Sequence, residues 1–305
     1  MKVDLVFEGG GILGLAFVGA YEALVKSGYQ IARSAGTSAG SIISALIMAG
    51  YSYEELASVI RKTDFSVFQK KTRLSHFGLF GKALSVIYNK GIYDIGIVQE
   101  WLQGLLLRKG VRTFKDLMTG GISPLKIIAA DITDRQLLIL PDDASYYGIE
   151  PEDFSVSLAV AMSCSIPLFF TPVKIAHGRV TNYIVDGGLL STFPIWIFDV
   201  EKTPRYPTFG FKIKDPKSNT AQGKAGIIPY LKDLITASIN TEETTYLRDA
   251  DLVRTIIIDF DNKNKSTDFK ITRTRINYLY ECGYQSTIAF LKQWNFFEYV
   301  KKYRM

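Results

Sequence analysis

The chain has 305 residues, of which 47% are hydrophobic and 22% are charged, and its formal net charge is +6. A hydrophobic content this high supports a sizeable packed core and excludes an intrinsically disordered protein. The two cysteines, Cys164 and Cys282, are too few for a disulfide framework and lack metal-ligand spacing, so we expect reduced core residues.

The N-terminus leads directly into a predicted strand over residues 3–7, without the charged and apolar segments of a secretory signal peptide. No uninterrupted apolar run approaches the ~18 residues that a membrane-spanning helix needs. These features favour a cytoplasmic protein, which could still contact a membrane surface peripherally.

A glycine-rich loop follows this strand and precedes an apolar helix that we expect to end near Val25, with Gly28 as its C-cap. Within the loop, Gly9, Gly11 and Gly14 fit the G-x-G-x-x-G pattern of dinucleotide-binding proteins. That interpretation is weak, because such a site needs an acidic residue at the end of the second strand to hold the ribose, and the sequence has none there.

An oxyanion hole is the interpretation of the glycine loop that we favour. The backbone amides of Gly9, Gly10 and Gly11 can face an ester carbonyl with no Cβ in the way. A purely structural glycine turn is the remaining alternative. Since no metal or nucleotide motif is left, we expect no cofactor.

A second motif, Gly36-Thr37-Ser38-Ala39-Gly40, lies between a predicted strand over residues 31–35 and an apolar helix over residues 41–49. Its G-x-S-x-G pattern is typical of a nucleophile elbow, in which a sharp strand-to-helix turn exposes the serine hydroxyl. The first N–H groups of the following helix would point toward an anion that forms beside Ser38. The pentapeptide alone fits an ordinary turn equally well.

Residues 51–120 lack the strand pattern, and we expect them to form a helical cap. Between Arg61 and Lys90, seven basic residues stand against Asp64 alone, an excess equal to the whole net charge. Aromatic and aliphatic side chains alternate with these bases, as on surfaces that rest on anionic lipid headgroups. The alternative is a cap whose aromatic side chains are simply core and whose lysines are simply solvated. No nucleic-acid-binding motif accompanies these basic residues, so they do not indicate a nucleic-acid-binding protein.

The sheet pattern resumes after the cap. We predict strands over residues 124–131 and 136–140, a helix over residues 155–163, and a hairpin whose arms, 172–175 and 180–185, flank His177. The second arm ends in Asp186-Gly187-Gly188. Further elements are expected in this order: a strand over 208–213, a loop over 214–224, a helix to about 248, a strand over 255–259, a loop over 261–266 and a last helix to about 299.

These elements predict the fold class and the domain organisation. The β-α-β-α opening implies a mainly parallel sheet with helices on both faces. Because the candidate site draws on residues from 9 to 188, these segments must share one domain. We therefore expect a single domain over residues 1–305, with the cap as an insertion at about 51–120.

The serine needs a base, and the chain has only two histidines. His177, with Asp131 as its acid, fits the Ser-Asp-His chain order, but it lies at an expected hairpin tip; His76 lies inside the basic segment. Asp186 is the better base, because it ends an apolar strand and its two following glycines allow a close approach. An Asx-turn residue that caps the hairpin is the structural alternative.

Three motifs occur in a fixed order: Gly9-Gly10-Gly11 with Gly14, then Gly36 to Gly40, then Asp186-Gly187-Gly188. Together with the segment 161–167, they resemble the patatin-like phospholipases, including the bacterial members of that family. The resemblance covers roughly the first two hundred residues. Each motif is weak by itself, whereas the ordered set is specific.

The resemblance implies a three-layer α/β/α sandwich and metal-independent hydrolysis of acyl esters in phospholipids or related lipids. It makes Ser38 the nucleophile, Asp186 its only side-chain partner, and Gly9, Gly10 and Gly11 the oxyanion hole. The remaining motif glycines, Gly14, Gly36, Gly40, Gly187 and Gly188, would support these groups.

Two points stay open at the level of the sequence. The family usually carries Arg or Lys just before the last glycine of its loop, and this chain has Leu13 there. The missing cation would have contributed positive charge at the oxyanion or anchored the loop. A protein that keeps the fold and binds lipid surfaces without catalysis is the alternative function.

Overall fold

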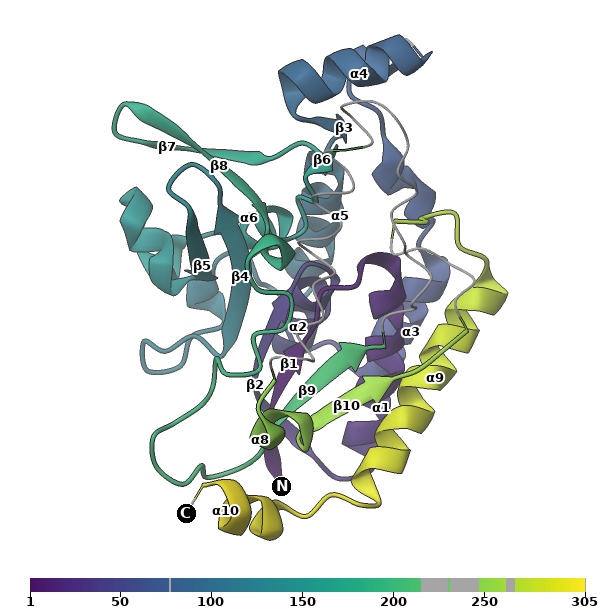
Figure 1. Cartoon of the computed structure of the whole chain (residues 1–305), viewed down its shortest axis with the longest axis vertical. Coiled ribbons are helices and arrows are strands. Elements are labelled where there is room, and N and C mark those ends of the chain that lie inside the picture. Colours follow the sequence, from purple (N-terminus) through teal and green to yellow (C-terminus); the bar gives the residue numbers. More distant parts are fainter. Residues whose placement is uncertain (77, 215–229, 231–246, 262–266, 305) are drawn as a thin grey trace.

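The computed structural model describes residues 1–76, 78–214, 230, 247–261 and 267–304 (Figure 1). The predicted loop over 214–224, the predicted helix that ends near 248 and the predicted loop over 261–266 lie almost wholly outside the described residues. Among the described helices, none combines the length and the apolar character needed to cross a bilayer.

A mainly parallel sheet forms the centre of the molecule, which confirms the predicted fold class. Its first five strands are mutually parallel, the sixth runs antiparallel to them, and the seventh, which pairs antiparallel with the sixth, again runs in the direction of the first five. Their order across the sheet is β10 (Thr255–Ile258), β9 (Thr208–Ile213), β1 (Lys2–Phe7), β2 (Gln30–Thr37), β4 (Leu125–Asp131), β8 (Val180–Asp186) and β7 (Val173–His177), and β5 (Gln136–Leu140) forms a hairpin with β4.

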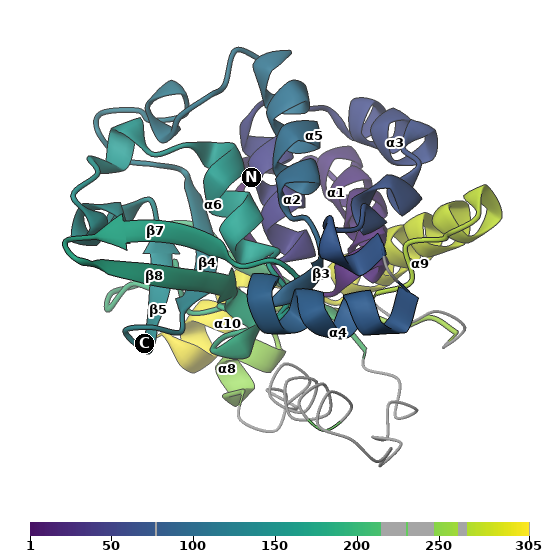
Figure 2. The same cartoon turned by 90° about the horizontal axis from the view of Figure 1, so that it is seen from above.

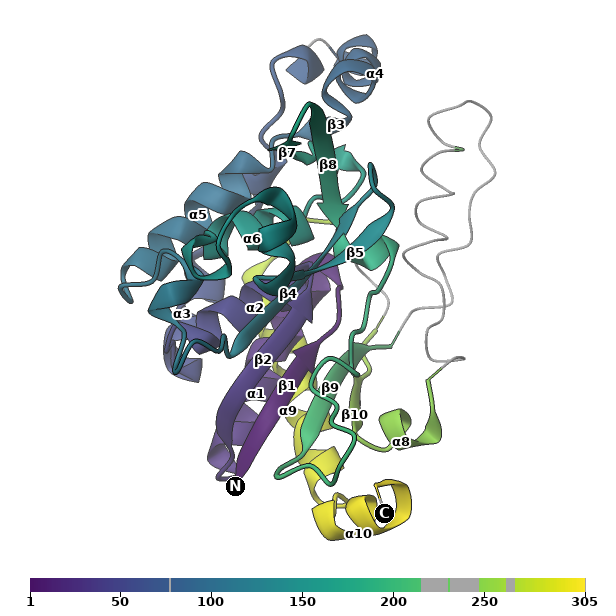
Figure 3. The same ribbon diagram turned by 90° about the vertical axis from the view of Figure 1, so that its left-hand side faces the viewer.

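Helices cover one face of this sheet (Figure 3). The inner ones are α1 (Ala16–Lys26), α2 (Ala39–Met48), α6 (Val156–Ser163) and α9 (Arg273–Leu291), and α3 (Tyr53–Lys62) and α5 (Gly96–Leu107) pack outside them. On the opposite face, Val6 and Ala35 contact a small cluster of Phe193, Ile195 and Phe198. The chain that follows β8 therefore covers part of that face.

The cap predicted for residues 51–120 contains α3, the 3-10 helix η2 (Phe65–Gln69), α4 (Gly78–Asn89) and α5. It also contains a short strand that the sequence did not predict, β3 (Gly91–Tyr93), which pairs in parallel with β6 (Leu168–Phe170). The helix α4 stands at one end of the molecule, beyond the sheet (Figures 1 and 2).

The prediction of one last helix to about residue 299 is wrong. The structure has two helices, α9 and α10 (Phe296–Tyr303). Asn295 separates them, because its side-chain oxygen accepts hydrogen bonds from the amides of Phe297 and Glu298 and thereby begins a new helix. Trp294 stacks on Phe290 at a centroid distance of 5.5 Å and holds the turn against the core.

The helix pair α1 and α9 crosses at two glycines. A Cβ built on Gly19 would lie 1.9 Å from the carbonyl oxygen of Tyr280, and one on Gly283 would lie 1.9 Å from that of Ala16. Backbone therefore contacts backbone at this crossing, and no larger residue fits at either position without separating the helices.

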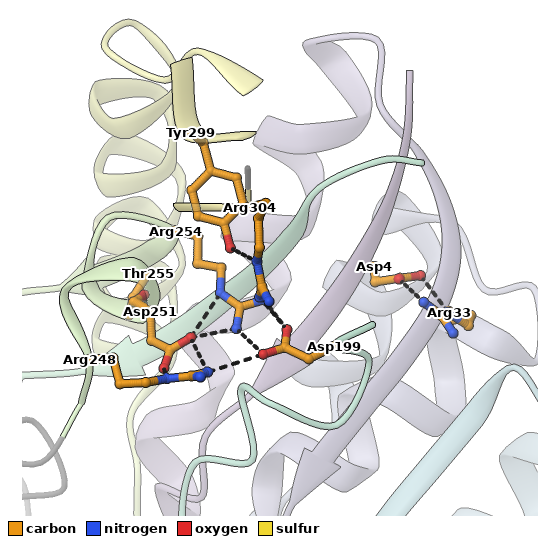
Figure 4. A network of polar contacts seen from close by, with 9 residues as sticks. All are labelled: Asp4, Arg33, Asp199, Arg248, Asp251, Arg254, Thr255, Tyr299 and Arg304. Atoms are coloured by element: carbon orange, nitrogen blue, oxygen red, sulfur yellow. Dashed lines mark hydrogen bonds and ion pairs between the residues drawn. The ribbon is translucent and has the colours of Figure 1, made fainter. Parts of the chain in front are cut away.

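A network of charged side chains joins the end of the chain to the sheet (Figure 4). Arg254, which is 2% exposed, donates to the carboxylates of Asp199 and Asp251. Arg248 contacts the same two carboxylates from the periphery, and Arg304 contacts that of Asp199. Since Arg254 directly precedes β10, this network ties α8 (Asp249–Leu252), α10 and the segment after β8 together.

Candidate active site

Ser38 lies in the sharp turn between β2 and α2, with φ 52° and ψ −123°. Positive φ is strained for a residue with a side chain, as expected of a nucleophile elbow. A Cβ on Gly40 would lie 2.4 Å from the carbonyl oxygen of Phe7, and one on Gly36 would lie 2.3 Å from the carbonyl group of Gly40. Both flanking positions therefore require glycine, which explains the spacing of the motif.

The end of α6 holds the backbone of the elbow. The amide of Ser38 donates to Ser163 Oγ at 2.8 Å, and that hydroxyl donates to the carbonyl oxygen of Ile128 at 2.6 Å. In the sequence, the segment around Ser163 stands out only through its resemblance to the family, and no role for this serine was predicted. A buried serine at the end of a short apolar helix leaves no signal in the sequence pattern.

Asp186 ends β8 and is 2% exposed. Its amide donates to the carbonyl oxygen of Ser165 at 3.0 Å, and its Oδ1 accepts from the amide of Gly188 at 2.8 Å. A Cβ on Gly187 would lie 2.4 Å from the carbonyl oxygen of Ile128, so the turn after Asp186 also depends on close backbone contact. The last turn of α6 and the two residues after it thus contact both Ser38 and Asp186.

Burial raises the pKa of Asp186 to about 6, while the nearby hydroxyl of Ser38 and the amide of Gly188 act in the opposite direction. Its second oxygen, Oδ2, is buried and accepts no hydrogen bond from the described part of the chain. Buried carboxylate oxygens without a hydrogen-bond donor are rare in proteins. A catalytic role in proton transfer is one reason for such an oxygen.

The glycine loop approaches Ser38 from β1. A Cβ on Gly9 would lie 3.3 Å from the Cβ of Ser38, and one on Gly14 would lie 2.8 Å from the Cβ of Ala39. The amide of Gly9 donates to the carbonyl oxygen of Thr192 at 3.0 Å. Within the described ranges, the amides of Gly10 and Gly11 donate no hydrogen bond.

A narrow apolar cavity of about 70 Å³ begins at Ser38 and Gly11. It runs between α2, α3 and α5 and is lined by side chains such as Ile43, Leu46, Leu56, Ile60 and Trp101. Aromatic rings, among them Phe68 and Phe269, contribute to the same wall, and their centroids are 6.2 Å apart. Phe269 follows β10 in the chain, so nothing in the sequence connects it with this site.

The alternative base, His177, lies at the turn end of the β7–β8 hairpin, whereas Asp186 lies at the other end of β8. Its suggested partner, Asp131, accepts hydrogen bonds from the hydroxyl of Tyr147 and the side-chain amide of Asn182, both at 2.6 Å. The carboxylate of Asp131 therefore bonds to Tyr147 and Asn182. His177 pairs with Val180 at the turn end of β8, so the length of β8 lies between His177 and Asp186.

The part of the chain that the structure describes holds no group of three or more His, Cys, Asp and Glu side chains that could bind a metal ion. Leu13, at the position where a cation was expected from the resemblance, belongs to the short helix η1 (Gly11–Leu15) and is buried in the core.

Comparison with known proteins adds independent information. A model of the patatin-like phospholipase family matches residues 5–199. The Bacillus subtilis protein YqhO is 35% identical over 302 residues, which cover 97% of this chain and 100% of YqhO. The probable lipid hydrolase 463L of Invertebrate iridescent virus 6 is 25% identical over 194 residues, 63% of this chain and 61% of the viral protein.

Two solved structures share the fold. VipD from Legionella pneumophila superimposes with a TM-score of 0.55 at 15% identity, and the match covers 95% of this chain and 66% of VipD. The type III effector ExoU superimposes with a TM-score of 0.52 at 14% identity, covering 95% of this chain and 53% of ExoU. The chain thus spans about two thirds of the one and about half of the other.

Proposed function

The chain belongs to the patatin-like phospholipase family, and we propose that it is a serine acyl-ester hydrolase that releases fatty acids from phospholipids or related lipids. The observation that carries the proposal is the strained Ser38, which opens onto an apolar cavity and interacts with a buried carboxyl group whose pKa is raised to about 6. The apolar lining of the cavity suits an acyl chain, and the carboxyl group can act as a base near neutral pH.

In the proposed reaction, Ser38 Oγ attacks the ester carbonyl carbon while Asp186 accepts the hydroxyl proton. The carbonyl oxygen becomes an oxyanion that faces the amides of Gly10 and Gly11 and the first turn of α2. Collapse of this intermediate breaks the ester bond, and the leaving alcohol takes the proton from Asp186. Water then attacks the acyl group on Ser38 and gives a proton to Asp186. The bond between the acyl carbon and Ser38 Oγ breaks, Ser38 Oγ regains its proton from Asp186, and the fatty acid is released.

The role of Gly9 differs in this proposal from that of the next two glycines. Its amide already donates to Thr192, whereas its missing side chain leaves room for Ser38. We therefore assign the oxyanion contacts to Gly10 and Gly11 and the close approach to Gly9.

Labelling with a fluorophosphonate tests the proposal directly, because this reagent reacts with an activated serine. Mass spectrometry of the labelled protein is expected to locate the adduct on Ser38, and a Ser38→Ala variant and heat-denatured protein are expected to remain unlabelled. No adduct on folded protein in the presence of detergent or lipid would favour the non-catalytic lipid-surface binder instead.

The pH dependence of hydrolysis is expected to report the base. Because Asp186 must be ionised to accept the proton, kcat/KM should be constant at high pH and fall as the pH drops through about 6. An ordinary aspartate would produce the fall near its usual pKa of 3.8. The measurement uses an uncharged aryl ester at constant ionic strength. A midpoint near 4 would contradict the raised pKa of Asp186, and one above about 7 would contradict its assignment as the base.

We further propose that the cap contacts anionic membrane surfaces. Phe80, which is 73% exposed, lies on the outer face of α4 together with Ile87 and Tyr88. Four cations lie on this helix or in the segment just before it, and no described carboxylate pairs with them: Lys70, Lys71, Arg73 and Lys82. Apolar side chains at the surface, flanked by such cations, match the chemistry of an anionic headgroup layer.

Vesicle binding tests this contact. A Phe80→Ser/Ile87→Ser variant and a Lys70→Gln/Lys71→Gln variant are each expected to weaken binding to phosphatidylglycerol-containing vesicles about tenfold. Hydrolysis of a water-soluble ester should not change. The matched control is Phe297→Ser: this phenylalanine is 83% exposed, and it lies on α10 at the opposite end of the molecule (Figure 1). Equal losses in all three variants would contradict the proposal.

A further inference from the structure

The glycine loop is joined to strand β9 by a buried charge pair. Glu8, the residue between β1 and the loop, is buried, and its carboxylate contacts the ammonium group of Lys212. The same carboxylate accepts a hydrogen bond from the amide of Ile213 at 2.7 Å. The side chain of Lys212 is 12% exposed. Both of these partners come from a strand some two hundred residues away, outside the region that the family model matches.

A second contact joins β9 to the loop itself. A Cβ on Gly10 would lie 2.4 Å from Cδ1 of Ile213, so this side chain packs directly against the backbone of Gly10. The amide of Glu8 also donates to the carbonyl oxygen of Phe211 at 3.0 Å. The end of β9 therefore touches both Glu8 and Gly10 at the start of the loop.

These contacts restrict the backbone of the glycine loop. Consecutive glycines have many accessible backbone conformations, so amides that must point at a developing oxyanion need to be held from outside. The loop has no cation of its own, since Leu13 is packed in the core. A buried ion pair with well-placed hydrogen bonds defines one geometry, because each charge is strongly destabilised without the other.

We infer that Glu8, Lys212 and Ile213 are positioning residues that hold the amides of Gly10 and Gly11 in the geometry needed for the oxyanion. This inference rests on the proposed acyl-ester hydrolase function. In this inference, β9 anchors the glycine loop. Leu13, which stands where the family usually has a cation, does not anchor it. None of the three residues is assigned a contact with the substrate.

The test is the variant Lys212→Met, which keeps the aliphatic stem and removes the charge. We expect kcat to fall at least tenfold and KM to change less than threefold, because misplaced amides affect the transition state more than substrate binding. Lys212→Arg should recover most of kcat. The matched control is Lys214→Met, since this exposed neighbour pairs with Asp259 at 2.5 Å and does not touch the loop.

A double variant separates positioning from simple stabilisation. Glu8→Gln/Lys212→Met removes both buried charges, so it should fold even if Lys212→Met alone does not, and its kcat should remain low. A kcat within twofold of wild type in either folded variant, or a change in KM alone, would overturn the inference.

Hydrogen exchange provides a readout that does not depend on catalysis. The amides of Glu8 and Gly9, which donate to the carbonyl oxygens of Phe211 and Thr192 at the start of the loop, should exchange at least tenfold faster in the double variant than in wild type, while those of the Lys214→Met control should not. Unchanged exchange would overturn the inference even in an inactive protein. An inactive wild type with the expected change in exchange would instead contradict the proposed function and leave the anchoring intact.

Discussion

Replacing Asp186 by Asn is expected to abolish turnover and, at the same time, to stabilise the folded protein. The loss of the base should lower kcat by three orders of magnitude or more, at the upper end of what general-base catalysis contributes. The gain in stability follows from the raised pKa. A carboxyl group whose pKa rises from 3.8 to about 6 on folding is less stable as a carboxylate in the folded state, by up to about 3 kcal/mol.

The expected gain in stability of the Asp186→Asn variant depends on pH. The raised pKa destabilises the wild type above about pH 6, and this penalty disappears as the pH falls from 6 toward 3.8, because the group then becomes protonated in both states. Urea unfolding at about pH 8 and about pH 5 should therefore show a larger advantage of Asp186→Asn at the higher pH.

Ser38→Ala is the matched comparison for Asp186→Asn. It should lower turnover at least as much, because it removes the nucleophile. It keeps the charge of Asp186 and the positive φ of the elbow, so its stability should not show the same pH-dependent gain. Near-wild-type activity in either variant would contradict the dyad, and an Asp186→Asn protein without added stability at high pH would contradict the buried, charged base.

The substitution Arg254→Met is expected to destabilise the protein by about 3–5 kcal/mol. It removes the central cation of the network in Figure 4 and leaves the carboxylates of Asp199 and Asp251 with fewer partners. Since Arg254 is 2% exposed, water cannot replace these contacts. The measurement is the free energy of unfolding in urea at neutral pH.

Arg248→Met provides the control for this prediction. Arg248 pairs with the same two carboxylates, but its side chain is 62% exposed. Its loss should therefore cost no more than about 1 kcal/mol. Equal effects of the two substitutions on the free energy of unfolding would mean that burial is not the source of the network's strength.

Much of the fold could be predicted from the sequence, because its strands are apolar and its turns contain glycine. The strand over residues 208–213 and the hairpin around His177 agree closely with β9, β7 and β8. The short pair β3 and β6 was missed, since three-residue strands carry no periodicity. The break between α9 and α10 was missed because the apolar pattern continues through it. The helix is interrupted there because Asn295 is the N-cap of α10.

The candidate site was predictable only where its residues lie in local motifs. Ser38 and Asp186 stand beside glycines whose spacing reflects close backbone contacts, and such spacing is visible in a sequence. Ser163, Phe269 and Lys212 reach the site through tertiary contacts of ordinary residue types. Apart from the family resemblance of the segment around Ser163, nothing in their neighbourhoods distinguishes them, so only the folded arrangement connects them with the elbow and the glycine loop.

The pairing of β9 with β1 determines how far this chain could be shortened. The family model ends at residue 199, whereas β1, which leads into the glycine loop, has β9 as one of its two neighbours in the sheet. A polypeptide that stopped at residue 199 would expose β1 as an open sheet edge, with unpaired amides and carbonyls beside the loop. The motifs of the first two hundred residues therefore depend on a C-terminal third that carries none of them, because it supplies the strand that completes the sheet in this register.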